Sequence, residues 1–200
     1  MHIPTHSSHK QTSTNDAPPS SSSEAPQKAL TIHSTWRKAF EHILSVYIAT
    51  HLAFLLLTYL AILFNFVPKN FSVYTLPLST LLQSWERWDS YHFVEIATKG
   101  YDVAYRTAFF PLFPLLEAGL GALLHNPFVA GLLISNLAGL GMLVVLYRLV
   151  AEDFDDELAE RTVLYLSVFP TAFFFAAAYN ESLFLFLALL SFYYMRRGQW

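Results

Sequence analysis

The sequence predicts an all-α polytopic membrane protein, and three observations lead to that prediction. Hydrophobic residues make up 54% of the 200 residues and charged residues only 14%, whereas a soluble domain has about a quarter charged. The mean hydropathy is positive, at +0.37. Several apolar stretches approach or exceed the ~20 residues that a helix needs to cross a bilayer.

The overall charge and the cysteine count exclude other classes of protein. The net charge is −3, so the chain carries no electrostatic footprint for a nucleic acid. The chain has no Cys, which excludes disulfides, thiolate chemistry and cysteine-based metal sites.

The chain divides by composition into a tail and a membrane domain. Residues 1–35 are rich in Ser, Thr, Pro and His, and they cannot bury enough apolar surface to offset the entropy of ordering. They also lack the apolar core of a signal peptide. We therefore expect a disordered tail over 1–35 and a transmembrane domain over 36–200.

About four segments are long and apolar enough to be predicted as membrane spans. They cover residues 39–67, 127–150, 162–179 and 183–195. Arg37 and Lys38 stand before the first span, which predicts a cytoplasmic N-terminus. Juxtamembrane helices are expected over residues 81–98 and 108–124.

The direction of the later spans depends on whether residues 108–124 cross the membrane. If they lie in the interface, the later arginines fall on the cytoplasmic side, as the positive-inside rule favours; these are Arg148, Arg161, Arg196 and Arg197. The same arrangement places residues 179–182 on the outer side with Asp89. The alternative is two full crossings joined by a hairpin at residues 125–127.

Residues 85–93 place acids, a base, an imidazole and large aromatic rings beside the first span. Ionisable groups there are costly to desolvate, which favours a functional site facing a water-filled cavity. In a helix over 81–98, Trp85, Asp89 and His92 would share one face. Asp89 could then act as a general base or hold a divalent cation. The alternative is an interfacial amphipathic helix whose aromatic rings form a membrane belt.

Two further groups of residues follow this run. Gly100 is expected to end the helix, and Arg106 beyond it could bind a phosphate or be a solvated loop charge. The prolines at the start of 108–124 cannot donate backbone hydrogen bonds, so that start is expected to be kinked. It could line a groove for an isoprenoid chain, formed by Phe110, Pro111, Phe113 and Pro114; the alternative is a helix start with packed aromatic rings.

A second polar island interrupts the apolar sequence at residues 179–182. Asn180 can cap the following helix, and Glu181 in its first turn suits the helix dipole. A functional role for Glu181 is the alternative, because burial of a carboxylate there is expensive. Glu117 and His51, inside apolar runs, are assigned to packing or to polar contacts between helices.

Four sequence blocks in order resemble the PIG-V type mannosyltransferases, that is, the GPI mannosyltransferase 2 family and its prokaryotic relatives. The blocks are Trp88-Asp89-Ser90-Tyr91-His92-Phe93, then Ile96-Ala97 with Gly100-Tyr101, then Phe109-Phe110-Pro111-Leu112-Phe113-Pro114, and finally Tyr179-Asn180-Glu181-Ser182-Leu183-Phe184.

The resemblance implies the N-terminal portion of a GT-C fold, with further spans beyond residue 200. It implies transfer of mannose from a polyprenyl-phosphate donor to a hydroxyl of a lipid-linked or glycan acceptor. Asp89 would be the catalytic base. The implied substrate-binding residues are Arg87, Trp88, His92, Tyr101, Arg106, Tyr179, Asn180 and Glu181.

No cofactor is required by the resemblance, although a divalent metal ion at Asp89 is compatible with it. The expected partners are membrane lipid, the polyprenyl-phosphate sugar and the acceptor, with no nucleic acid. The location would be the plasma membrane of a prokaryote or the endoplasmic reticulum of a eukaryote.

Two other functions compete with a glycosyltransferase. A transporter or flippase for a lipid-linked substrate would also need ionisable groups in a membrane cavity. It would tend to show paired, repeat-related broken helices, whereas the polar motifs here cluster on one predicted side. The other alternative is a catalytically inactive, truncated membrane subunit.

Overall fold

The computed structural model describes residues 24–65 and 78–198. The chain divides into two compact units, Met1–Thr35 and Trp36–Trp200, and the features below belong to the second. Of the predicted disordered tail, residues 1–23 lie outside the described residues, and helix α1 begins at Glu24. The described residues are helical with no strand, which confirms an all-α membrane protein.

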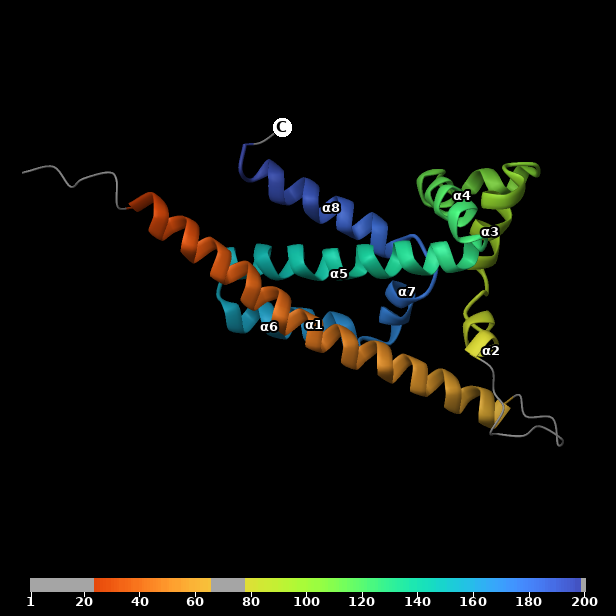
Figure 1. Cartoon of the computed structure of the whole chain (residues 1–200), viewed down its shortest axis with the longest axis horizontal. Helices are drawn as coiled ribbons and strands as arrows, with labels where there is room; N and C mark the ends of the chain where they lie inside the picture. Colours follow the sequence, from red (N-terminus) through yellow and green to blue (C-terminus); the bar gives the residue numbers. More distant parts are fainter. Residues whose placement is uncertain (1–23, 66–77, 199–200) are drawn as a thin grey trace, which may run out of the picture. The chain divides into compact units, whose positions relative to one another are not determined.

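Ten helical segments follow one another along the described chain (Figure 1). In order they are α1 (Glu24–Asn65), α2 (Leu78–Gln83), α3 (Asp89–Lys99), η2 (Ala104–Ala108), α4 (Leu112–Leu124), α5 (Pro127–Asp153), α6 (Asp156–Val168), η3 (Pro170–Ala172), α7 (Phe173–Ala176) and α8 (Glu181–Met195). η2 and η3 are 3₁₀ turns.

By length and composition, two described helices can cross a membrane alone. They are Phe40–Phe64 of α1 and the whole of α5. A third span is possible if Pro170–Ala176 and α8 count as one, although the pair is bent by 89°. The predicted span 162–179 is not one helix, because α6 ends at Val168, next to Pro170.

Helix α5 is the centre of the packing, with α4, α6 and α8 against it (Figure 1). Small residues at intervals of four, Gly131, Ser135 and Gly139, let neighbouring chain segments approach closely. A methyl group on Gly139 would lie 3.3 Å from Oγ of Ser182 in α8. Near the C-terminal half of α5, Ile43 of α1 packs in a hydrophobic core with Met142, Leu143, Tyr147, Ala159 and Val163.

The region before α4 differs from the sequence expectation. The predicted helix 81–98 is two helices, α2 and α3, separated at residues 84–88. Trp85 therefore does not share a helical face with Asp89. Instead Trp85 is buried, and its indole Nε1 donates a 2.9 Å hydrogen bond to Thr58 of α1. Gly100 ends α3 with φ 74°, as predicted.

Helix α4 is short and ends in a tight connection to α5. It has 13 residues, which rise about 20 Å, less than the ~30 Å of a bilayer core. Asn126 caps α5 by accepting a 3.1 Å hydrogen bond from the N–H of Val129, and Pro127 occupies the first turn. Gly121 approaches the backbone of Pro127 so closely that a Cβ would lie 2.8 Å from its Cα.

Candidate functional site

Asp89 is the first residue of α3 and follows a strained turn. Trp88 has φ 49° and ψ −121°, and the N–H of Ser90 donates a 3.2 Å hydrogen bond to the carbonyl of Arg87. These values fit the second position of a type II′ turn, which normally holds glycine. A bulky residue with positive φ is a conformational outlier, and such outliers concentrate at functional sites. We call residues 87–90 the Asp89 turn.

Tyr179 joins the Asp89 turn to the far end of the sequence. Its side chain is buried, and its hydroxyl donates a 2.9 Å hydrogen bond to the carbonyl oxygen of Arg87, 92 residues away. This is the same carbonyl that closes the turn with Ser90. The hydroxyl of Tyr179, expected to bind substrate, is thus engaged within the protein.

The backbone around Tyr179 is itself held by α5. The hydroxyl of Ser135 donates a 2.6 Å hydrogen bond to the Tyr179 carbonyl and accepts a 3.1 Å hydrogen bond from the Tyr179 N–H. The side-chain amide of Asn136 donates to the carbonyl of Ala176 at 2.8 Å. Irregular backbone at membrane depth needs such internal partners, because lipid supplies none.

Asp89 and Glu181 approach the same place from distant parts of the chain. The negative charge of Asp89 acts on the carboxyl of Glu181, and both charges act on Tyr179. Asp89 is exposed, whereas Glu181 is partly buried and its Oε2 has no hydrogen-bond partner among the described residues. The hydrogen bond from Tyr179 to Arg87 brings the segment of Glu181 to the turn that holds Asp89, and a shared role of the two acids stays a prediction.

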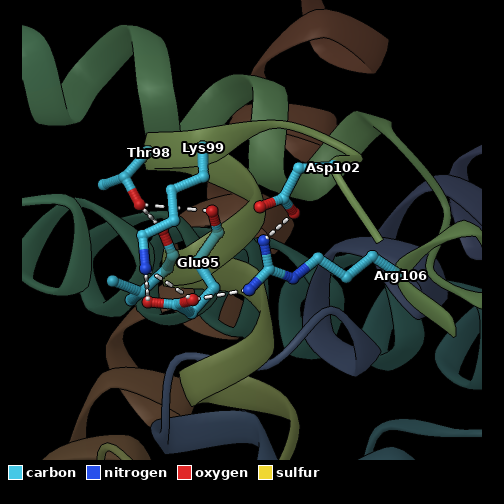
Figure 2. A network of polar contacts seen from close by, with 6 residues as sticks. Glu95, Thr98, Lys99, Asp102 and Arg106 are labelled. Carbon is cyan, nitrogen blue, oxygen red and sulfur yellow. Dashed lines mark hydrogen bonds and ion pairs between the residues drawn. The ribbon is translucent and has the colours of Figure 1, made fainter. Parts of the chain in front are cut away.

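Arg106 is buried, so the expectation of a solvated loop charge is wrong. Its guanidinium donates to Glu95 at 2.5 Å and to Asp102, and Lys99 donates to Glu95 at 3.0 Å (Figure 2). The hydrogen bond from Lys99, together with the charges of Lys99 and Arg106, lowers the pKa of Glu95. Two of the three guanidinium nitrogens of Arg106 are thus occupied, and its buried Nε has no hydrogen-bond partner in the part of the chain that the structure describes.

Arg87 differs from Arg106 in being exposed and in having no ion-pair partner among the described residues. Every other Lys or Arg side chain that the structure describes has a carboxylate partner. Arg87 is therefore the cation next to Asp89 that has a guanidinium available for an anion.

His92 and Tyr101, also predicted to bind substrate, have mainly internal contacts. His92 lies one turn after Asp89, and its ring is 5.6 Å from that of Tyr105 and 5.3 Å from that of Phe109, between ring centroids. Its Nδ1 is buried and has no partner within the described ranges. The hydroxyl of Tyr101 donates a 3.1 Å hydrogen bond to the carbonyl of Phe109.

Two pockets border the segment that carries Tyr179 and Asn180. The first, of about 260 Å³, is an almost entirely apolar groove lined by Phe110, Leu112, Phe113, Asn180, Leu183, Phe184 and Leu187. The second, of about 250 Å³, combines aromatic and polar groups and is lined by Thr58, Ala61, Ile62, Ser84, Trp85, Arg87, Trp88, Phe173 and Tyr179. Of the four residues predicted to line a lipid groove, Phe110 and Phe113 line the apolar pocket, whereas Pro111 and Pro114 do not.

Sequence reasoning missed three residues beside this site. Ser135 and Asn136 lie within a segment that was predicted only as an apolar span. The spacing of four between Gly131, Ser135 and Gly139 is the signal of close helix packing that could have pointed to Ser135. Glu117 of α4 is fully buried, and neither carboxyl oxygen has a hydrogen-bond partner among the described residues. Burial, reinforced by the charge of Glu86, raises the pKa of Glu117 to about 8; α4 is not among the candidate spans.

The comparisons with known proteins gave one match. The sequence model of the family described as Mannosyltransferase (PIG-V) matches residues 60–200, which include the Asp89 turn, α8 and every residue of the two pockets except Thr58. No curated protein and no solved structure matches the chain.

Proposed function

The chain belongs to the mannosyltransferase (PIG-V) family, and from this premise we propose that it transfers mannose from a polyprenyl-phosphate donor to an acceptor hydroxyl. The acceptor would be a lipid-linked or glycan molecule, and the fold would be of the GT-C type. The N-terminus would be cytoplasmic and the site would open on the outer or luminal side.

One observation carries this proposal: Asp89 is exposed on a strained turn whose residues Arg87 and Trp88 line the pocket that combines aromatic and polar groups. An exposed carboxylate there is accessible to a hydroxyl group.

In the proposed reaction, Asp89 accepts the proton of the acceptor hydroxyl. The oxygen then forms a bond to the anomeric carbon of mannose, while the bond from that carbon to the phosphate oxygen breaks. The bonding electrons leave with the phosphate, which gives polyprenyl phosphate.

Charge and polarity suggest where the parts of the donor lie. The guanidinium of Arg87 suits the phosphate, since planar guanidinium groups pair well with phosphate oxygens. The apolar groove at Phe113 and Phe184 suits the isoprenoid chain, because it would bury hydrocarbon that water solvates poorly.

The proposal is tested with membranes that contain the chain and a radiolabelled polyprenyl-phosphate mannose. Asp89→Asn should lower kcat about 10²- to 10⁴-fold, as loss of a general base does, and Arg87→Gln should weaken transfer while Arg87→Lys retains part of it. The matched control is Glu86→Gln, an acid three residues away. Transfer by Asp89→Asn within threefold of the unmodified chain, at equal protein content in the membrane, would refute Asp89 as the base.

A further inference from the structure

Asp89 cannot hold its position through α3 alone. The turn that precedes it places Trp88 in a backbone conformation that favours glycine, at a cost on the order of 1–3 kcal/mol for such a residue. The side chain of Trp88 is 72% exposed, so its own packing offsets little of that cost. Contacts from elsewhere must therefore stabilise the turn.

The contact that reaches the turn comes from Tyr179. Its hydroxyl binds the carbonyl of Arg87, which is the acceptor of the turn's own hydrogen bond. Tyr179 belongs to a buried hydrophobic cluster with Trp85, which lies two residues before the turn. Movement of Tyr179 would therefore move the carbonyl that defines the turn.

A single side chain of α5, that of Ser135, makes hydrogen bonds to the peptide groups of Tyr179. Ser135 is fully buried and makes two hydrogen bonds to the peptide groups of Tyr179, one as a donor and one as an acceptor. Without these two hydrogen bonds, the carbonyl and the N–H of Tyr179, between α7 and α8, would lose the side-chain partner that α5 provides. The N–H retains only a 2.8 Å contact to the carbonyl of Ala177.

We propose that Ser135 is a positioning residue for the transfer reaction, acting in series through Tyr179 to hold the Asp89 turn. Ser135 itself touches neither the proposed substrate pockets nor Asp89. This inference rests on the proposed role of Asp89, and it adds a requirement: α5 must be seated against Tyr179 before the carboxylate is correctly presented.

The first test is kinetic and uses the full chain in membranes. Ser135→Ala and Tyr179→Phe should each lower kcat about tenfold with KM within twofold, and the double variant should be no worse than Ser135→Ala alone. Additive losses in the double variant would overturn the series arrangement. The matched control is Ser182→Ala, since Ser182 is equally buried and donates a 3.0 Å hydrogen bond to the Phe175 carbonyl without contacting Tyr179. Its kcat should stay within twofold.

The second test needs no activity, so it separates this inference from the proposed function. Spin labels are placed at the exposed residues Tyr91 of α3 and Phe192 of α8, which is straightforward because the chain has no cysteine. The distance distribution between the labels should broaden in Ser135→Ala and Tyr179→Phe but not in Ser182→Ala. An unchanged distribution in the first two variants refutes the inference. If the distance distribution broadens in these variants but Asp89→Asn keeps full transfer, Ser135 does position the turn and Asp89 is not the catalytic base.

Discussion

The packing of α4 against α5 predicts a coupled effect of two substitutions, Gly131→Ala and Glu117→Ala. A Cβ at Gly131 would lie 2.5 Å from Oε1 of Glu117 and 3.1 Å from Cβ of Ala178. Both neighbours are fully buried, so the carboxyl has little room to move away. Overpacking of this kind costs about 1–3 kcal/mol, while alanine gains up to about 1 kcal/mol over glycine in helix propensity.

We therefore expect Gly131→Ala to lower the free energy of unfolding by about 1–2 kcal/mol. In a Glu117→Ala background the carboxyl is gone and only the Ala178 contact remains, so the same substitution should cost nearly nothing. The coupling free energy between the two sites should then be about 1–2 kcal/mol. Gly119→Ala on α4 is the control, since a Cβ there meets nothing within 4 Å.

The measurement is reversible unfolding of the purified protein in mixed micelles, by titration with sodium dodecyl sulfate and far-ultraviolet circular dichroism. If Gly131→Ala carries the same penalty with and without the Glu117 carboxyl, the steric argument is wrong. If Gly119→Ala is as destabilising as Gly131→Ala, the effect reports loss of glycine rather than a clash.

Two pH dependences follow from the acids outside the candidate spans. The pKa of Glu117 is raised from 4.5 to about 8, so stability should be highest below pH 4.5 and fall as the pH rises through about 8. The loss in the free energy of unfolding should be on the order of a few kcal/mol. Glu117→Gln should abolish this pH dependence. If the variant keeps it, Glu117 is not its source. The pKa of Glu95 is lowered from 4.5, chiefly by the hydrogen bond from Lys99. The stability that Glu95 contributes should be present above pH 4.5 and lost as the pH falls through the lower pKa that Glu95 has in the folded protein. If Glu95→Gln loses as much free energy of unfolding in acid as the unmodified chain, this prediction is wrong.

The sequence predicted the helices that hydropathy alone determines. Two long apolar runs became α1 and α5, and Gly100 ended α3, because apolar length and a missing Cβ are local properties. A shared role of Asp89 and Glu181 stays a prediction, based on the positive-inside rule, which places both on one side of the membrane.

The break between α2 and α3 could not be predicted, because its cause is not local. Trp88 occupies a position that favours glycine, so its residue type argues against the turn that it forms. The stabilising partner, Tyr179, is 92 residues further along the chain. Pattern analysis of residues 81–98 therefore continued the helix through a turn that only tertiary contacts create.

The burial of Arg106 was predictable in part. The spacing of four between Asp102 and Arg106 is present in the sequence, as is that between Glu95 and Lys99, and such pairs commonly interact within helices. What the sequence lacked was the ion pair between Glu95 and Arg106, which joins α3 to η2 across a bend. That contact converts an apparent loop charge into a buried one.

The hydrogen bond between Tyr179 and Arg87 has a consequence for biosynthesis. The Asp89 turn leaves the ribosome about 92 residues before the tyrosine that stabilises it, a delay of roughly 5–18 s at ordinary elongation rates of about 5–20 residues per second. Through this interval the nascent chain contains the acid but not the contact that orients it. The turn can therefore take its folded geometry only after the segment between α7 and α8 has been synthesised and has docked.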